Sequence, residues 1–455
     1  MITSDDSRLS WAAAVVLAYL LFCTWTWWRR RKQHAEAVAI GGAAPMLLVY
    51  ASQTGFAEEL ARRSASLLQA AGRSVRLLSI EQLDAPLLAS ARQALFVLST
   101  TGEGDAPDAA AGFLRKVMAK PQALPDLRYG LLALGDSSYK QFCGFGRQVD
   151  AWLRQSQAAP LFEAIEVDNG HDAALQAWLR QLQRFGAVAE GWKAPGYRRW
   201  QLQGREWLNP GSPGGPAYHI FLSPPDDSEN GQWQAGDIVE ILPGIAEDVA
   251  SPPEGQQHRE YSIASLPADG GIALLVRRMD HPDGRLGLGS GWLTQIAEIG
   301  GGIALRIRSN SGFHPPEGKY PLILIGNGTG LAGLLAHLKA RRLAGHNRNW
   351  LIFGERTAAH DFFFRQQIEA WHAEGSIEKL DLAFSRDQAE RRYVQHCLRE
   401  QAASLRQWVA EGASIYVCGS RHGMAGDVEA ALVDVLGAEA VQVLRERGRY
   451  RRDVY

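Results

Sequence analysis

The sequence predicts a chain of mixed class, α/β plus β-barrel, in which two doubly wound α/β domains flank an antiparallel barrel and an N-terminal transmembrane helix precedes them. Apolar segments of strand length alternate with helix-like segments over residues 46–189 and again over residues 319–455. Between these regions, over residues 216–318, short strand-like segments alternate with turns, a spacing typical of an antiparallel barrel. Residues 10–28 contain no charged side chain, and a run of this length can span a bilayer as a helix.

Length, charge and cysteine usage set limits on the protein class. With 455 residues, the chain is long enough for two or three domains. Its net charge of -1 gives no reason to expect nucleic-acid binding. No two cysteines form a CxxC pair, so neither a zinc or other metal site nor a disulfide framework is predicted, and a reducing compartment fits. The four cysteines are Cys23, Cys143, Cys397 and Cys418.

The N-terminal region predicts a membrane anchor. Residues 1–9 form an acidic tail, and residues 10–28 form the apolar run, which ends in several tryptophans of the kind found at membrane interfaces. Arg29 to Lys32 follow directly and begin a linker over residues 29–45. The positive-inside rule then places the tail outside and the rest of the chain in the cytoplasm, as a single-pass protein of the cell (inner) membrane. A cleaved signal peptide is the alternative, but the basic cluster follows the apolar run instead of preceding it.

The domain over residues 46–189 is predicted to contain a parallel sheet. Its candidate strands are apolar runs without alternation, which indicates strands covered by helices on both faces. They are MLLVY at 46–50, VRLLS at 75–79, ALFVLST at 94–100, GLLALG at 130–135 and a short stretch near 162–167. In a doubly wound sheet, ligands bind at the carboxyl ends of the strands.

Three polar, glycine-rich loops follow strands of this domain. They are SQTGFAE after the first strand, STTGEGDAPD after the third and LGDSSYKQFCGFG after the fourth. The first loop opens a helix, where hydroxyl and N–H groups can bind an anion, although such a loop can also be an ordinary strand-to-helix turn. It is not a P-loop, because no Gly-Lys-Ser/Thr follows. Three such loops on one sheet edge, one with an aromatic at Tyr139, predict a pocket for a phosphorylated planar ring.

With these loops the domain resembles the flavodoxin-like FMN domain of diflavin reductases, a family that includes sulfite reductase flavoproteins and cytochrome P450 reductases. Two departures are Phe56 in the phosphate loop and Thr101, where the P450 reductases carry a stacking tyrosine. Tyr139 could also be mere packing and Cys143 a buried apolar filler. The FMN-binding residues that the resemblance implies are Ser52, Gln53, Thr54, Gly55, Ala57, Thr100, Thr101, Gly102, Gly135, Tyr139, Phe142, Cys143 and Asp168.

Residues 190–215 are rich in Gly, Pro, Trp and Arg, and we expect a linker that passes into the first strand of the barrel. The barrel contains RxYS and, later, GxxSxxL, which together resemble the FAD signature of the ferredoxin-NADP reductase superfamily. Diflavin reductases usually carry a helical connecting domain before RxYS, but here only residues 244–258 stand at that place. The FAD-binding residues implied are Arg259, Tyr261, Ser262, Gly287, Ser290, Leu293 and Tyr455.

The domain over residues 319–455 shows dinucleotide-binding features. GNGTG after its first strand lets backbone N–H groups approach a pyrophosphate. The segment SRDQAERRY offers guanidinium groups and hydroxyls for a 2′-phosphate, which favours NADPH over NADH, although a solvated basic surface is the usual fate of such a cluster. The NADPH-binding residues implied are Gly326, Gly328, Thr329, Arg356, Asp361, Ser385, Arg386, Arg391, Tyr393 and Gln395.

The chain ends in Asp-Val-Tyr. In the resembled family a terminal aromatic stacks on FAD and moves to admit nicotinamide, whereas a functionless tail is the simpler reading. The residues implied to surround the hydride path are Ser262, Cys418, Asp453 and Tyr455.

The resemblance therefore implies a membrane-anchored NADPH-dependent diflavin oxidoreductase, with electrons passing from NADPH to FAD, to FMN and to a haem-protein acceptor such as sulfite reductase or a cytochrome. A ferric-chelate (siderophore-type) reductase is the alternative, and a flavin-binding redox sensor or scaffold without turnover is a third. Nothing in the sequence separates the first two.

Overall fold

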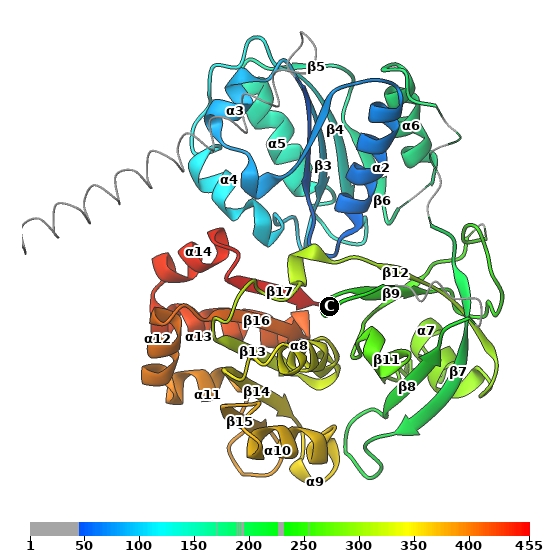
Figure 1. Cartoon of the computed structure of the whole chain (residues 1–455), viewed down its shortest axis with the longest axis vertical. Helices are drawn as coiled ribbons and strands as arrows, with labels where there is room; N and C mark the ends of the chain where they lie inside the picture. The colour runs from blue at the N-terminus through cyan, green and yellow to red at the C-terminus, as the bar shows by residue number, and fades with distance from the viewer. Residues whose placement is uncertain are drawn as a thin grey trace, which may run out of the picture.

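The computed structural model describes residues 45–170, 172–188, 190, 192, 195–225, 232–253 and 255–455. They form an N-terminal α/β domain, a β-barrel and a C-terminal α/β domain (Figure 1). The N-terminal domain lies across the other two, and in the view of Figure 1 it occupies the upper half.

The N-terminal domain is built on a parallel sheet in the order β2-β1-β3-β4, with β5 and β6 both paired to β4. Its strands are β1 (Met46–Ala51), β2 (Val75–Ser79), β3 (Gln93–Ser99), β4 (Arg128–Gly135), β5 (Ala159–Pro160) and β6 (Ile165–Asp168). Its helices are α2 (Phe56–Ala70), α3 (Ala85–Ser90), α4 (Ala111–Lys116), α5 (Gly144–Gln155) and α6 (Asp172–Gln183), with short turns η1 (Ile80–Gln82) and η2 (Asp108–Ala110). Apolar side chains of α2 and α6 cover one face, and those of α3, α4 and α5 cover the other. The predicted strands are confirmed, because residues buried on both faces give continuous apolar runs.

The barrel is antiparallel, in the order β10-β9-β12-β7-β8-β11. Its strands are β7 (Arg198–Trp207), β8 (Ala217–Ser223), β9 (Ile238–Ile241), β10 (Arg259–Ser262), β11 (Ile272–Arg277) and β12 (Gly302–Arg308). Strand β7 takes up ten of the 26 residues in the range 190–215, where we expected a linker that passes into the first strand of the barrel. Only Trp200 and Leu202 of β7 are buried, and a bulge follows them between Leu202 and Gly204, so the strand shows little apolar pattern in the sequence.

The connection between β9 and β10 is the short one expected, without an inserted domain in the described residues. The Gly/Ser segment itself forms α7 (Leu288–Gly291) and runs into η5 (Trp292–Ile296), whose Leu293 is buried in the core of the barrel. The remaining short turns are η4 (Pro267–Asp269) and η6 (Ser311–Phe313).

The C-terminal domain contains a parallel sheet in the order β15-β14-β13-β16-β17. Its strands are β13 (Leu322–Asn327), β14 (Asn349–Glu355), β15 (Lys379–Phe384), β16 (Ser414–Gly419) and β17 (Tyr450–Val454). Its helices are α8 (Leu331–Leu343), α9 (Ala358–Asp361), α10 (Arg365–Ala373), α11 (Val394–Glu400), α12 (Ala402–Ala410), α13 (Gly426–Leu436) and α14 (Ala438–Glu446), with turns η7 (Gly328–Gly330) and η8 (Arg421–Ala425). One apolar cluster joins α8 and β13 to Ala217 and Leu275 of the barrel, so these two domains share a core.

The N-terminal domain contacts the other two mainly through polar groups. Arg308 of the barrel donates to the carbonyl oxygen of Thr54 at 3.0 Å, and Arg452 of β17 donates to Asp108 at 3.0 Å. Glu446 of α14 forms ion pairs with two basic residues of α4. The interface is therefore charged, in contrast to the apolar core that joins the barrel to the C-terminal domain.

The prediction of a membrane protein needs correction. Within the described part of the chain, no helix has the length and apolar character that crossing a bilayer requires, and this contradicts the predicted location in the cell (inner) membrane. The run at 10–28, on which that prediction was based, lies outside the described residues.

Gly55 gives a direct test of the docked arrangement. Its φ is +86°, and a Cβ atom there would lie 1.9 Å from the carbonyl oxygen of Ser309 in the barrel. Gly72 has a similar φ of +76°, but a Cβ there would meet nothing within 4 Å. Gly55→Ala and Gly72→Ala should each cost about 1–2 kcal/mol for the left-handed backbone. Only Gly55→Ala should also push the domains apart.

We therefore expect small-angle X-ray scattering of the full-length protein to give a larger radius of gyration for Gly55→Ala and an unchanged one for Gly72→Ala. Equal radii for the two variants would contradict the docked arrangement.

Candidate functional site

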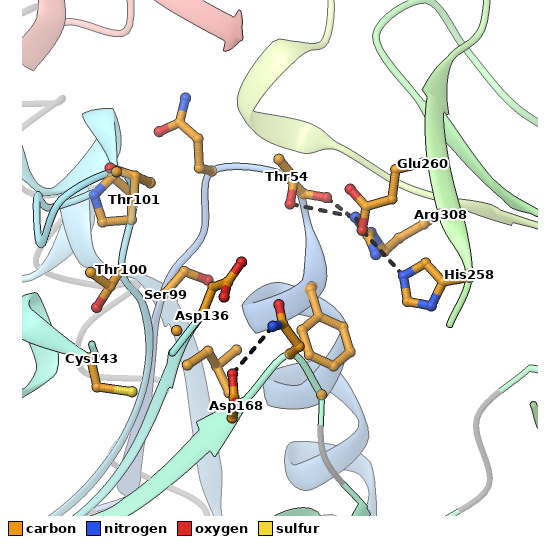
Figure 2. Close-up of a pocket in the computed structure, with 18 of the residues that line it drawn as sticks. Thr54, Ser99, Thr100, Thr101, Asp136, Cys143, Asp168, His258, Glu260 and Arg308 are labelled. Carbon is orange, nitrogen blue, oxygen red and sulfur yellow. Dashed lines mark hydrogen bonds and ion pairs between the residues drawn. The ribbon is translucent and has the colours of Figure 1, made fainter. Parts of the chain in front are cut away.

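A cavity of about 2460 Å³ lies between the N-terminal domain and the other two. Its N-terminal wall is made by the loops after β1, β3 and β4, as Figure 2 shows for part of it. The predicted FMN residues on this wall are Gln53, Thr54, Thr100, Thr101, Gly102, Gly135, Tyr139, Phe142, Cys143 and Asp168. The three loops thus meet at one sheet edge, as the parallel arrangement requires.

The loop after β1 has the form of an anion site. Gly55 takes a left-handed conformation directly before α2, and the hydroxyl of Ser52 is buried without a hydrogen-bond partner among the described residues. The hydroxyl of Thr100, on the loop after β3, is in the same state. Unpaired buried hydroxyls are costly, so these two fit a ligand that supplies their partners. Ala57, in contrast, is buried against the core of the domain.

The loop after β4 is fixed by Asp168, whose carboxylate accepts from the backbone N–H of Ser137 at 2.9 Å and from its hydroxyl at 2.6 Å. Cys143 precedes α5 in a left-handed conformation, and its buried thiol donates to the carbonyl of Ala133. Burial raises the pKa of this thiol to about 12, which makes Cys143 a packing residue and not a nucleophile.

Phe56, the departure noted in the phosphate loop, also lines the cavity. The guanidinium carbon of Arg308 lies 5.8 Å from the centre of its ring, and the ring is in van der Waals range of a Cβ built on Gly170. The ring thus packs between the loop after β6 and the barrel.

The FAD motifs come together inside the barrel. Arg259 lines the cavity, and Gly289 lies so close to β10 that a Cβ there would stand 2.7 Å from the Tyr261 hydroxyl. This close approach explains the glycine at this position of the turn, which packs directly against the RxYS strand. Ser290 and Leu293 have internal partners: the Ser290 hydroxyl accepts from the Met279 N–H, and Leu293 is fully buried in the barrel core.

The four residues predicted for the hydride path lie together where β10, β16 and β17 meet. Ser262 Oγ donates to Asp453 Oδ2 at 2.7 Å, and Cys418 Sγ lies 3.7 Å from the same oxygen. The Tyr455 hydroxyl lies 3.3 Å from that of Thr329, and the ring of Tyr455 remains largely exposed.

Burial raises the pKa of Asp453, and the Ser262 and Cys418 hydrogen bonds offset only part of that rise. Burial and the neighbouring Asp453 charge also raise the pKa of Cys418. The cluster therefore holds a destabilised buried carboxylate next to a neutral thiol.

Predicted nucleotide residues divide into two groups. Thr329 and the nearby glycines form the loop between β13 and α8, where a Cβ on Gly330 would lie 2.2 Å from the Cys418 carbonyl oxygen. Arg386 and Arg391 follow β15, and neither has an ion-pair partner among the residues that the structure describes. The intervening Arg392 is paired with Glu400.

The other predicted NADPH-binding residues either have protein partners or lie elsewhere in the C-terminal domain. Asp361 is fully buried and accepts hydrogen bonds from Asn209 and Thr357, so it fixes the loop after β14. Gln395 donates to Asp427 on α13. The remaining members of the predicted set occupy these positions: Gly326 at the end of β13, Gly328 in η7, Arg356 after β14 near Gly214, Ser385 buried after β15, and Tyr393 exposed before α11.

Sequence reasoning missed two cavity residues that come from outside the N-terminal domain. Arg308 reaches the loop after β1, and the guanidinium carbon of Arg421 lies 5.0 Å from the centre of the Tyr139 ring. The backbone N–H of Arg421 also donates to the backbone oxygen of Tyr455, which links the two sites. No sequence motif marks either arginine, because their importance comes from the docking of domains.

The raised pKa of Asp453 predicts how stability depends on pH. A carboxyl in an unfolded chain has a pKa of about 3.9, so the wild-type protein should lose stability as the pH rises from about 4 through the higher folded value. Asp453→Asn keeps an acceptor for Ser262 without the charge. We expect the difference in the midpoint of thermal unfolding, Asp453→Asn minus wild type, to be more positive at about pH 8 than at about pH 4.5.

Asp283→Asn is the control, because hydrogen bonds from Arg285 lower the pKa of that exposed carboxyl. It should show no gain at the higher pH. A gain for Asp453→Asn that does not vary with pH would contradict the buried-charge interpretation.

Comparison with known proteins supports one site in the N-terminal domain and a second in the C-terminal domain. Residues 48–179 match the flavodoxin family, and residues 324–430 match the oxidoreductase NAD-binding domain family. The sulfite reductase (NADPH) flavoprotein alpha-component of Vibrio vulnificus is 28% identical, with 93% of this chain and 89% of the relative covered. The protein of the same name from Neisseria meningitidis serogroup C is 29% identical, with 95% of each covered.

These alignments span 550 and 574 positions, more than the 455 residues of this chain, so the relatives carry segments that it lacks. The flavodoxin match covers the N-terminal domain, and the NAD-binding match covers most of the C-terminal domain. The barrel with RxYS lies between them in the sequence. The chain therefore resembles the diflavin reductases in the kind and order of its domains.

Proposed function

We propose that the protein is an NADPH-dependent diflavin oxidoreductase that passes electrons to a haem-protein acceptor, the haemoprotein of a sulfite reductase. The observation that carries the proposal is the Ser262–Cys418–Asp453 cluster, which lies between the barrel and the nucleotide domain. A flavin-binding scaffold without turnover has no use for a buried carboxylate at this point, since burying it costs stability.

The residues present fit all three cofactors. When bound, FAD accepts a hydride from NADPH and passes single electrons to FMN. The protein's own part is to hold and orient these groups. Ser262 keeps the Asp453 carboxylate in place, and that charge favours the cation that nicotinamide becomes as hydride leaves. Tyr455 covers the approach to this point and must move to admit nicotinamide.

We propose that the loop after β1 binds the FMN phosphate. The loops after β3 and β4 are proposed to bind its ring. Their shared cavity extends to Arg259 of the barrel, so the proposed FMN and FAD sites open into one space.

Preference for NADPH is proposed to rest on Arg386 and Arg391. Arg386 and Arg391 are exposed and have no ion-pair partner among the described residues, and Ser385 and Tyr393 flank them in the sequence, a combination that suits a 2′-phosphate. Asp361 and Gln395 have protein partners, and we propose that they support this site from within the fold.

The proposed acceptor rests on the names of the relatives, which are components of sulfite reductases. A ferric chelate remains the alternative acceptor, but no described residue favours it.

The activity is tested with purified protein reconstituted with both flavins. NADPH oxidation should depend on an added acceptor and should be coupled to sulfite reduction when a sulfite reductase haemoprotein is present. Rapid turnover with a ferric chelate and none with the haemoprotein would replace the proposed acceptor. Failure of NADPH to reduce the bound flavins would reject the enzyme.

Coenzyme selectivity gives a second test. Arg386→Ala and Arg391→Ala should each raise KM for NADPH roughly tenfold or more, because each removes a charge-assisted hydrogen bond. KM for NADH should stay nearly constant, because NADH carries no 2′-phosphate. Arg392→Ala is the matched control, since that side chain already pairs with Glu400 and donates to Leu382. Parallel losses with NADPH and NADH would contradict the assignment of the 2′-phosphate site.

A further inference from the structure

Strand β17 takes part in both the hydride cluster and the domain interface, through two neighbouring residues. Successive side chains of a strand point to opposite faces, so Arg452 and Asp453 extend to opposite sides. Asp453 accepts from Ser262 at 2.7 Å, whereas Nε of Arg452 donates to the Asp108 carboxylate of the N-terminal domain at 3.0 Å. Figure 1 shows β17 on the side of the C-terminal domain that faces the N-terminal domain. Because the two residues adjoin, a shift of Arg452 also moves Asp453.

The backbone of β17 is held from the N-terminal domain as well. The strand lies at the edge of its sheet, where it pairs with β16 and places Asp453 in register with Cys418. Nε2 of Gln53, on the loop after β1, donates to the carbonyl oxygen of Arg452 at 2.7 Å. Gln53 is itself fixed, since its Oε1 accepts from the backbone N–H of Asp108 at 3.0 Å. An edge strand has no further strand to pair with on its outer side, so this donor is a fixed point for its backbone.

Two carboxylates and two guanidinium groups fix the Arg452 side chain. Its Nη1 donates to Glu429 on α13 at 2.8 Å. Arg445 of α14 lies 3.3 Å from the Asp108 carboxylate and 2.8 Å from that of Glu429. The charges of the four groups balance, so what Asp108 contributes is geometry and not net charge. Asp108 is the member of this cluster that comes from the N-terminal domain.

The N-terminal domain has a second anchor, which does not involve β17. Arg308, at the end of β12, is buried at 4% exposure and donates to the carbonyl oxygen of Thr54 at 3.0 Å. Two carboxylates of the barrel balance its charge: Glu240 forms ion pairs with Arg308 and Arg306, and Glu260 lies 2.7 Å from Arg308. Burial alone would raise the pKa of Glu240, but the two guanidinium charges lower it to about 2.

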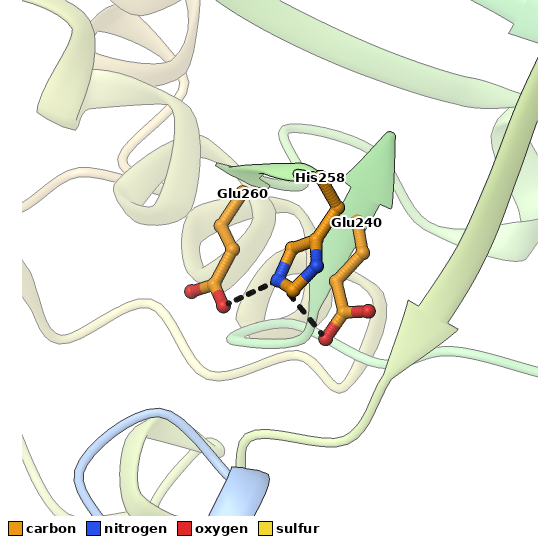
Figure 3. A group of neighbouring side chains, drawn as sticks. All are labelled: Glu240, His258 and Glu260. Atoms are coloured by element: carbon orange, nitrogen blue, oxygen red, sulfur yellow. Dashed lines mark hydrogen bonds and ion pairs between the residues drawn. The ribbon is translucent and has the colours of Figure 1, made fainter. Parts of the chain in front are cut away.

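His258 stands beside the same carboxylates (Figure 3). The ligand atoms of Glu240, His258 and Glu260 lie within 4.8 Å of one another, a spacing that could suit a metal ion. Because two guanidinium groups already neutralise Glu240, a further cation is disfavoured, and the group is an ion-pair network that positions Arg308. This anchor remains when the Asp108 contact is removed, so the effect of that contact on β17 can be separated from docking.

We propose that Asp108 is a positioning residue for hydride transfer: through Arg452 it fixes β17, and thereby the Asp453 carboxylate, when the domains are docked. The proposal rests on the function proposed above. Placement matters here because a displacement of about 1 Å can slow a reaction by up to about a hundredfold. Since Asp108 reaches Arg452 only in the docked arrangement, hydride transfer is fastest when the proposed FMN and FAD sites open into one space.

Asp108→Asn tests the role by removing the charge at nearly constant size. Full-length protein with both flavins bound is mixed with NADPH in the absence of oxygen, and the flavin absorbance reports reduction. We expect the first phase of reduction to be roughly tenfold slower, with KM for NADPH and FAD content unchanged. NADPH that carries deuterium at the transferred position should give a primary isotope effect at least as large as in the wild type.

Glu446→Gln is the matched control, because Glu446 of α14 pairs with Arg115 and Lys116 of the N-terminal domain, away from β17. It should leave the rate of flavin reduction at the wild-type value. Asp108→Glu keeps the carboxylate and should restore most of the rate. Arg452→Lys is a second variant on the other side of the contact: it keeps the charge, loses the forked geometry, and should also slow reduction at constant KM.

The outcomes separate the two proposals. Wild-type reduction rates in both Asp108→Asn and Arg452→Lys would overturn the positioning role. Equal slowing in Glu446→Gln and Asp108→Asn would also overturn it, because docking itself and not the strand would then be responsible. If Asp108→Asn does not retain FAD, the rate of Arg452→Lys decides by the same criterion. Wild-type protein whose bound flavins NADPH does not reduce would instead overturn the proposed function.

Discussion

The charged contact between the N-terminal domain and the barrel creates the cavity on which the rest of the site depends. The barrel and the C-terminal domain share an apolar core, so their relative positions are fixed by burial. The N-terminal domain is held by ion pairs and hydrogen bonds such as those of Arg308 and Arg452. Ion pairs at an interface contribute less net free energy than a shared apolar core, because the charged groups lose their hydration on docking. The half that holds the Ser262–Cys418–Asp453 cluster is therefore the more firmly joined one, and the domain that holds the loops after β1, β3 and β4 is attached to it by polar contacts.

Separation has a functional reason, because docking covers those loops. A Cβ at Gly55 would lie 1.9 Å from the carbonyl oxygen of Ser309 in the barrel, and a Cβ at Gly102 would lie 2.0 Å from the guanidinium of Arg421 in the C-terminal domain. A protein acceptor cannot approach these same loops while the barrel occupies them. The connection between β9 and β10 carries no described helical domain that could hold the N-terminal domain from the side. Direct contacts must therefore hold the closed arrangement.

Local patterns predicted the elements and the motifs, and long-range docking accounts for what they missed. The apolar strands of both α/β domains were readable because burial on both faces leaves a continuous run. Strand β7 was not, since only Trp200 and Leu202 of its residues are buried. Ser262, Cys418 and Asp453 are far apart in the sequence, and the family resemblance alone placed them together. Arg308 and Arg421 have no such motif, because their partners belong to another domain.

The ion-pair network around Glu240 explains why docking can be both specific and reversible. Replacing a buried charge network by apolar side chains is often neutral or stabilising, so stability alone does not require it. What the network provides is one guanidinium fixed at the barrel surface, with its Nε directed at Thr54. When the domains part, that donor loses its protein acceptor, and an unmet buried donor costs about 1–3 kcal/mol. From this one contact, a cost of this size favours the docked state by roughly five- to 150-fold. Exposure to water on opening reduces this contribution, and the contacts of Arg452 with Asp108 and of Glu446 with Arg115 add to it.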